Sequence, residues 1–280
     1  VDETEELGEV ALTTWAARTL DHPNASTAIE ALRRMEPGHR PYPTVELSWA
    51  LTALVLDGND AADMALAEKI AEVLMGSFRQ ESGLFPSGRA EKHLSALRAH
   101  VCCFADVVYP IQALSYYHMA TGNAHAAEVA TRCAERICQL QGPQGQWWWH
   151  YDIRTGQVLE RYPVYAVHQD AMAPMALFAL ADACGRDYSA SIEKGLRWLF
   201  HPPEKTGSLV DAERHIIWRK VARRGPSKFV RGLQALASSA HPGIRVPAVD
   251  VLFPPVTIDY ESRPYHWGWL LYAWPAGRQS

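Results

Sequence analysis

Apolar residues recur with helical spacing in three similar blocks of the sequence. The blocks are Val45 to Leu56, Val107 to Met119 and Met172 to Leu180. Apolar side chains occupy nearly the whole circumference of each block, so each predicts a helix that is buried on all sides.

A glycine follows each block and marks the end of the predicted helix. These glycines, Gly58, Gly122 and Gly185, are 64 and 63 residues apart. Glycine commonly takes the left-handed conformation that ends a helix. A second helix, polar on one side, is predicted after each glycine. These second helices are Ala61 to Phe78, His125 to Leu140 and Ser189 to Phe200.

A further glycine follows each second helix, at Gly83, Gly145 and Gly207, at intervals of 62 residues. Landmarks that share one period indicate repeated helical hairpins. A buried first helix covered by a half-exposed second helix predicts an all-α fold, an α/α toroid whose hairpins close into a ring. The repeat has a period of about 62–64 residues. We expect residues 1–280 to form one such domain, and an open α-solenoid of the same hairpins is the alternative.

Additional helices and a hairpin are predicted around the repeats. The helices are Glu5 to Leu20, Ala25 to Met35, Ile216 to Arg224, Lys228 to Ser239 and Tyr265 to Trp274. Two loops, 80–98 and 141–169, are long and rich in aromatic residues, which is typical of functional loops. Pro163 and a turn at Gly156 predict a short β-hairpin inside the second loop.

Composition narrows the class of protein. Of the 280 residues, 48% are hydrophobic and 21% are charged, which excludes a disordered chain and a fibrous repeat. No apolar run approaches the about 20 residues of a transmembrane helix. The net charge of −4 argues against a nucleic-acid-binding protein. No signal peptide is visible, so a cytoplasmic location is the default, with five cysteines that we expect to be reduced.

Positive charge gathers in one part of the chain. Residues 186–245 hold twelve Lys and Arg against five acidic residues, although the whole chain is acidic. Such a basic sector can attract an anionic substrate or support a peripheral membrane contact. A solvated helix face, including 218–224, is the alternative.

The segment after the second hairpin carries a recognisable spacing. Gln141-Gly142-Pro143-Gln144-Gly145-Gln146-Trp147 follows the pattern Q-x-x-x-G-x-W, and Gln80-Glu81-Ser82-Gly83-Leu84-Phe85 is a degenerate copy one period earlier. Over residues 40–207 the chain therefore resembles the superfamily of terpenoid cyclases (squalene–hopene cyclase-like) and protein prenyltransferases, whose members are α/α toroids. The resemblance implies that the glutamine caps a helix end and stacks on the tryptophan, which is a structural role.

The motifs that carry chemistry in that superfamily are missing. The sequence has neither the D-x-D-D acid motif nor the D-D-x-x-D metal motif, and Asp60, in a superficially similar stretch, is expected to cap a helix. His93, His100, Cys102 and Cys103 match no metal-ligand spacing. We therefore expect no metal and no cofactor.

The strongest candidates for chemistry stand just before the third buried helix. A toroid has its pocket at the end of the ring where the inner helices begin, and His168 and Asp170 lie at such a start. An aspartic acid in an aromatic pocket that excludes water has a raised pKa and can donate a proton, which His168 could hold or reload. The alternative is that Asp170 caps its helix and His168 is structural.

Aromatic residues supply most of the candidate substrate contacts. Trp148, Trp149, His150 and Tyr151 form the densest cluster, and their rings suit stacking on a sugar or stabilising a carbocation. On a strand, only alternate members would face one pocket. Core packing is the alternative for any single tryptophan.

The remaining candidates lie just ahead of His168 or at other starts of inner helices. Expected to bind substrate are Tyr109, Tyr162, Tyr165, Arg263 and His266, and expected to act in catalysis are Glu261 and Tyr265. Arg263 suits a carboxylate or phosphate group, and an ion pair with Glu261 or Asp170 is the alternative. Glu46 and Asp106 stand at the starts of other inner helices, so they are expected at the same end of the ring.

Three functions fit this sequence. The first is a terpenoid cyclase-like enzyme that acts on an isoprenoid substrate by proton-initiated carbocation chemistry, with Asp170 as the acid. The second is a carbohydrate-active toroid enzyme, a lyase, C5-epimerase or glycoside hydrolase acting on an acidic sugar. The third is a non-catalytic helical-repeat scaffold that binds a partner. The superfamily resemblance favours the first. The expected partner is a small molecule and not a nucleic acid, and the sequence leaves the oligomeric state open.

Overall fold

The computed structural model describes residues 6–56, 60–88, 98–204, 207–223, 227–242, 246 and 252–275. Gly58 of the first predicted turn and His93 lie outside the described residues. Within them, helices pair into antiparallel hairpins. The pairs are α1 (Leu7–Thr19) with α2 (Ala25–Arg34), α3 (Thr44–Val55) with α4 (Ala61–Ser77), α5 (Ala105–Thr121) with α6 (Ala124–Leu140), and α7 (Ala173–Cys184) with α8 (Ser189–Phe200).

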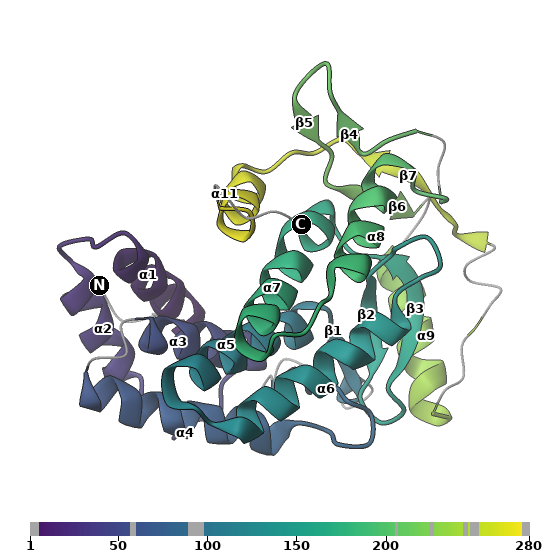
Figure 1. Ribbon diagram of the computed structural model, residues 1–280. Helices are drawn as coiled ribbons and strands as arrows, with labels where there is room; N and C mark the ends of the chain where they lie inside the picture. Colours follow the sequence, from purple (N-terminus) through teal and green to yellow (C-terminus); the bar gives the residue numbers. More distant parts are fainter. Residues whose placement is uncertain are drawn as a thin grey trace.

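The first helix of each pair is the inner one. Helices α1, α3, α5 and α7 pack side by side in that order, and their partners lie outside them (Figure 1). Helix α5 is buried continuously from Asp106 to Ser115, whereas α6 buries only part of its circumference. The predicted toroid of inner and outer helices is therefore confirmed.

The last described helix, α11 (Pro264–Ala273), lies between α1 and α7. Trp15 of α1 packs edge-on against Trp269 and Tyr272, with ring centroids 5.6 and 5.4 Å apart. On the other side, Phe178 of α7 meets Trp274 at 4.9 Å. The predicted last helix is confirmed, with Pro264 in its first turn.

The predicted helix ends are also confirmed where they are described. Gly122 and Gly185 take left-handed conformations after α5 and α7, with φ of 72° and 66°. The Asp60 carboxylate accepts the backbone N–H groups of Ala62 and Asp63 at 2.8 and 3.0 Å, which caps α4.

The Q-x-x-x-G-x-W segment joins neighbouring hairpins. Gln141 ends α6, and its side-chain amide donates to the Ser191 carbonyl of α8 at 2.9 Å and to the Gly145 carbonyl at 3.2 Å. Gly145, with φ of 100°, lies directly against the backbone of Lys194 in α8. Trp147 is fully buried against Phe104. The motif therefore has a structural role, and the stacking of Gln141 on Trp147 that the resemblance implies stays a prediction.

The degenerate copy repeats this arrangement one hairpin earlier. Gly83 packs against Arg136 of α6, and Arg132 of α6 donates to the Gln80 carbonyl at 2.6 Å. Phe85 is fully buried beside Phe78. Each copy therefore fastens the end of one hairpin to the outer helix of the next.

Small antiparallel sheets accompany the helices, and the predicted helical fold is confirmed as a mostly helical one. One sheet has the order β1 (Val101–Cys103), β2 (Trp148–Asp152), β3 (Gln157–Pro163), and β2 and β3 form the predicted hairpin around Gly156. Two further pairs are β4 (Val210–Asp211) with β5 (Ile216–Ile217), and β6 (Lys220–Arg223) with β7 (Pro255–Asp259).

The predicted helix from Ile216 to Arg224 was wrong. Its described part contains β5 and β6, and in β6 Val221 and Arg223 are buried while Lys220 and Ala222 are half-buried. This alternation has the period of a strand. The basic side chains do not form a solvated helix face, because Arg219 and Arg223 pair with Glu261 and Glu160. The predicted helix from Lys228 to Ser239 is confirmed as α9 (Ser227–Ala240).

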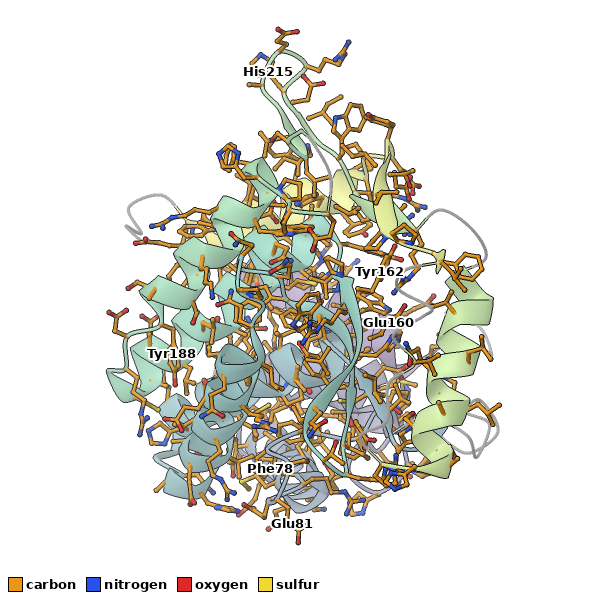
Figure 2. The ribbon with its side chains drawn as sticks, turned by 90° about the vertical axis from the view of Figure 1, so that its right-hand side faces the viewer. Phe78, Glu81, Glu160, Tyr162, Tyr188 and His215 are labelled. Atoms are coloured by element: carbon orange, nitrogen blue, oxygen red, sulfur yellow. The ribbon has the colours of Figure 1, made fainter. Side chains whose placement is uncertain are left out.

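Helix α9 and the sheets lie to one side of the helical hairpins (Figure 1). Figure 2 shows Glu160 and Tyr162 on the β-sheet beside α9, and His215 at the tip of the β4–β5 hairpin. The described cysteines are all free thiols. No described helix is both long and apolar enough to cross a membrane.

Candidate functional site

A cavity of about 290 Å³ opens where the inner helices begin. We call it the mouth. Its lining residues come from the starts of α3 and α5 and from the segment that leads into α7. They are Pro43, Val45, Glu46, Trp49, Cys103, Ala105, Asp106, Tyr109, His168 and Met172. Glu46, Asp106, Tyr109 and His168 are rim residues that the sequence had placed together.

His168 is a titratable residue whose pKa this environment lowers strongly. It begins a π-helical turn, His168–Met172, that continues into α7, and its ring meets Trp149, Tyr165 and Phe104 edge-on. Its Nδ1 is buried and has no hydrogen-bond partner among the described residues. Burial, together with the nearby charge of His266, lowers the pKa of His168 to about 3. The ring is therefore neutral at pH 7.

This lowered pKa predicts a pH dependence of stability. Between pH 6.5 and about 3 the unfolded state binds a proton at His168 and the folded state does not, so acid favours unfolding. The contribution of the neutral His168 to the free energy of unfolding is complete above pH 6.5. Below pH 6.5 it declines by about 1.4 kcal/mol per pH unit. Denaturant titrations should therefore show a smaller loss of unfolding free energy in His168→Gln than in the unmodified chain between pH 6.5 and 5. Parallel pH curves for the two proteins would contradict the assignment.

Asp170 lies two residues further along the π-helical turn and pairs with His266 of α11. The His266 Nε2 is 2.8 and 2.9 Å from the two carboxylate oxygens of Asp170, and both residues are buried. Burial raises the pKa of the Asp170 carboxyl, and the hydrogen bond from His266 opposes part of that shift. Trp274 donates its indole N–H to the Asp170 carbonyl at 2.7 Å. His266 within α11 and Trp274 at its end thus fix one residue of the turn.

The structure separates the expected roles of the two histidines. The sequence had placed His168 as the partner that holds the Asp170 proton, but His266 makes that contact. No side-chain capping bond from Asp170 is found in the described turn. Arg263 pairs with Glu261, at 2.5 Å, rather than with Asp170.

A stacked pair of aromatic rings stands beside His168. Trp149 and Tyr165 are stacked, with centroids 4.7 Å apart and ring planes inclined by 25°. Above Tyr165 lie the guanidinium of Arg219 at 4.6 Å and the ammonium of Lys220 at 4.9 Å from the ring centroid. Cations attract the negative face of an aromatic ring. The basic strand β6 therefore reaches the aromatic side of the site.

Glu261 is held by cations and is not close to the mouth lining. It forms ion pairs with Arg219 and Arg263, which lower the pKa of its carboxyl. Arg263 and Tyr265 are exposed and do not line the mouth. Tyr109 does line it, with its hydroxyl 3.5 Å from the Met172 sulfur, and burial raises the pKa of this phenol.

Four predicted contact residues point elsewhere. Trp148 is buried and donates its indole N–H to the Leu140 carbonyl at 2.9 Å. Tyr151 is fully buried under the sheet. His150 faces Glu160, with Nδ1 3.4 Å from the carboxylate, and Tyr162 lies under Arg223. Of the cluster 148–151, only Trp149 contacts His168.

Several residues of the site were missed by sequence reasoning. Trp49 lies three residues after Glu46 on α3 and packs edge-on against Tyr109 at 5.2 Å. Its signal was available, because residues three apart share a helix face. Cys103 and Met172 line the mouth next to predicted residues, and burial raises the pKa of the Cys103 thiol.

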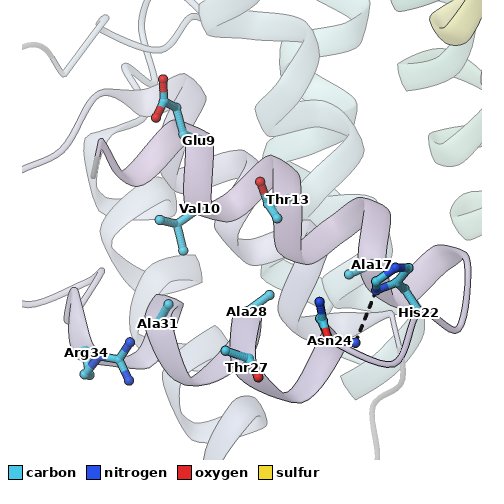
Figure 3. Close-up of a pocket in the computed structure, with 10 residues that line it drawn as sticks. All are labelled: Glu9, Val10, Thr13, Ala17, His22, Asn24, Thr27, Ala28, Ala31 and Arg34. Atoms are coloured by element: carbon cyan, nitrogen blue, oxygen red, sulfur yellow. Dashed lines mark hydrogen bonds between the residues drawn. The ribbon is translucent and has the colours of Figure 1, made fainter. Parts of the chain in front are cut away.

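A larger hollow of about 470 Å³ lies between α1 and α2 (Figure 3). Small or polar residues such as Ala28, Thr27 and Asn24 line it, and it contains none of the predicted site residues. We therefore place the candidate site at the mouth, where the perturbed titratable groups meet. No cluster of three metal-binding side chains occurs in the part of the chain that the structure describes.

Solved structures with the same architecture have names that refer to sugars. A D-mannose isomerase matches with a TM-score of 0.57 and 14% identity over 76% of this chain and 60% of its own. A cellobiose 2-epimerase from Bacillus thermoamylovorans matches at 0.55 and 9%, over 68% and 57%. An unsaturated glucuronyl hydrolase from a Bacillus species matches at 0.57 and 11%, over 97% and 85%.

The fold is an α/α toroid, which is shared with the matched unsaturated glucuronyl hydrolase structures. The chain spans less than two thirds of the isomerase and the epimerase that it matches. No protein-family model and no curated protein sequence matches the chain. The toroid part of the cyclase resemblance is therefore supported, and the matched structures named above are sugar enzymes rather than terpenoid cyclases.

Proposed function

We propose that this chain is a carbohydrate-active enzyme that isomerises or epimerises a sugar by proton transfer at the mouth. The observation that carries the proposal is the buried, neutral His168 beside a buried carboxylate–histidine pair. The named functions of similarly folded proteins support the choice of a sugar. The isoprenoid alternative is less well supported, because charged or polar groups such as Glu46 and Asp106 share the mouth with the apolar residues.

His168 would bind the substrate oxygen on which negative charge develops. Since its Nδ1 has no partner, the less costly neutral tautomer leaves a lone pair there and carries the proton on Nε2. A neutral imidazole can then donate a hydrogen bond to a sugar carbonyl and stabilise the enediolate that forms from it.

The His266–Asp170 pair would move the proton. Hydrogen bonding to a carboxylate orients an imidazole and stabilises its protonated form. In the proposed reaction a C–H bond next to the carbonyl breaks, and its proton moves to this pair through one bridging water, because neither Asp170 nor His266 is among the residues that line the mouth. Return of the proton to the neighbouring carbonyl carbon, with transfer of the adjacent hydroxyl proton to the former carbonyl oxygen, gives a ketose. Return of the proton to the opposite face of the same carbon gives an epimer. No other reactant is consumed.

A second candidate is glycoside hydrolysis, favoured by two carboxylates, Glu46 and Asp106, in the same cavity. The pair considered from sequence, Asp170 and Glu261, is less suited, because His266 holds one carboxylate and Arg219 with Arg263 hold the other. The buried Asp170 also weighs against a non-catalytic scaffold.

The test is to incubate the full chain in D2O with mannose, glucose, cellobiose and an unsaturated glucuronyl disaccharide, and to follow each by NMR. The expected result is a new ketose or C2 epimer that carries deuterium at the exchanged carbon. New reducing ends without deuterium at carbon would replace the proposal with hydrolysis. The absence of any change in all four sugars would contradict both.

A further inference from the structure

The groove between α1 and α2 lies where the other hairpins have a covering helix. Helix α4 lies against both helices of the next hairpin, α5 and α6, and α6 lies against α7 of the hairpin after it. The hairpin of α1 and α2 is the first, and no described helix precedes it. In a closed ring its covering helix would come from the last hairpin, but no described helix follows α11. We call this surface the α1–α2 groove.

Small side chains form much of the α1–α2 groove, whose volume is about 470 Å³. Among the described residues, only α1, α2 and the turn that joins them line it. Val10 and Ala31 are buried in it, whereas Thr13 and Thr27 are exposed. The distance between packed helices depends on the side chains at their contact, so these small residues allow another helix to come close.

One end of the α1–α2 groove carries an acidic and a basic side chain. Glu9 lies in the first turn of α1 and Arg34 in the last turn of α2, at the end of the groove away from His22 (Figure 3). Both side chains are exposed, and neither has an ion-pair partner among the described residues. An acid and a base on one face can each pair with the opposite charge of a second molecule.

The two charges stand at nearly the same height along the hairpin. The Thr14 hydroxyl is 3.1 Å from the Ala28 carbonyl, which aligns the two helices at these residues. From there Glu9 lies about 7.5 Å back along α1, and Arg34 lies about 9 Å onward along α2. Because α1 and α2 are antiparallel, both displacements run in the same direction.

We propose that the α1–α2 groove is a contact surface between two copies of this chain, whose first hairpins pack as an antiparallel four-helix bundle. A two-fold axis parallel to the helices places α2 of the partner copy along α1 and antiparallel to it. Since Glu9 and Arg34 share a height, Glu9 of each copy then faces the partner's Arg34. A surface that matches itself about a two-fold axis favours a second copy over an unrelated helix.

The length of the surface sets the expected strength of association. Helices α1 and α2 have 13 and 10 residues, so the groove extends over about 15–20 Å. A contact of this length buries less than the about 1,200–2,000 Å² of stable protein complexes. Association is therefore expected to be weak and reversible, with a Kd of about 100 μM.

The experiment measures the oligomeric state of the full chain by sedimentation equilibrium at protein concentrations from about 5 to 500 μM. The expected result is a monomer–dimer equilibrium that weakens as the salt concentration is raised, because salt screens exposed ion pairs. A chain that stays monomeric over this whole range would leave the groove to a helix of another protein and overturn the proposal.

Charge exchange shows whether the contact lies at this groove. Glu9→Arg and Arg34→Glu each place like charges opposite one another, at two symmetric positions, and should raise the Kd about fivefold. The double variant Glu9→Arg/Arg34→Glu brings opposite charges together again and should recover the Kd of the unmodified chain. In the double variant each charge lies at the unfavourable end of its helix dipole, so a recovered Kd cannot come from a more stable hairpin.

Glu30→Arg is the matched control, because Glu30 is an exposed residue of α2 that does not line the groove. This variant should leave the Kd unchanged. The proposal is overturned if the single exchanges leave the Kd unchanged, if the double variant does not recover it, or if Glu30→Arg weakens association as much as they do. Each readout is association, so the result stands apart from any outcome of the sugar assay.

Discussion

His168→Gln is expected to lower kcat/KM of the proposed sugar reaction by about a thousandfold, within the range that a positioned proton-transfer or hydrogen-bonding group contributes. Glutamine keeps a polar side chain in the mouth, but it cannot reproduce the imidazole ring held among Trp149, Tyr165 and Phe104. The measurement is the steady-state rate of deuterium incorporation for whichever sugar the NMR assay shows to react.

His100→Gln is the matched control for this loss. His100 is also a buried histidine, but its Nε2 meets the Ser238 hydroxyl at 2.7 Å beneath α9, away from the residues that line the mouth. Burial lowers its pKa, as it does for His168. Its replacement should leave kcat/KM within about threefold, a difference of under 1 kcal/mol. If both variants lost activity equally at full folding, the effect would reflect buried histidines in general and not the mouth.

Gly145→Ala is expected to destabilise the fold by about 4 kcal/mol or more, the range of the most damaging single substitutions. A Cβ at this position would overlap the backbone carbonyl of Lys194 in α8, which cannot swing aside as a side chain could. The left-handed φ of 100° adds strain. Chemical denaturation followed by circular dichroism measures the loss.

Gly122→Ala separates the two causes. Gly122 also has a left-handed φ, of 72°, but a Cβ there would meet nothing within 4 Å. Only the conformational cost remains, about 1 kcal/mol. Similar losses for the two variants would show that α6 and α8 can move apart, and that the Q-x-x-x-G-x-W segment does not fasten them.

The repeat could be predicted from sequence because its landmarks are local. Gly122 and Gly185 end helices through their own backbone conformation, and Gly145 permits a close approach that a larger residue would block. The left-handed helix end and the close backbone approach each favour glycine, so a glycine recurs at a fixed interval in the sequence. Periodicity of apolar residues then distinguishes the inner helices from the outer ones.

The composition of the site could be predicted only in part. Glu46, Asp106, Tyr109 and His168 could be placed together from sequence, because the starts of inner helices meet at one end of a toroid. The pairing of Asp170 with His266 could not be predicted, since 96 residues separate the two and only the closed ring brings them together. Likewise, the sequence does not record the irregular register of β2 against β3 at His150.

The strand β6 shows why charge spacing misled the prediction. Arg219, Lys220 and Arg223 are spaced as on a helix face, but each finds a partner on a different element, at Glu261, Asp259 and Glu160. The segment pairs with β7 as a strand, and the sequence pattern records neither that strand nor the ion-pair partners.

The attachment of α11 to Asp170 has a consequence for the order of assembly. His266 and Trp274 reach the same residue across 96 and 104 positions of the chain. During synthesis the hairpins up to α7 emerge first, so their starts can gather while Asp170 still lacks both contacts. The catalytic arrangement that we propose would then form late. In a nascent chain the helical hairpins would pack before His266 contacts Asp170.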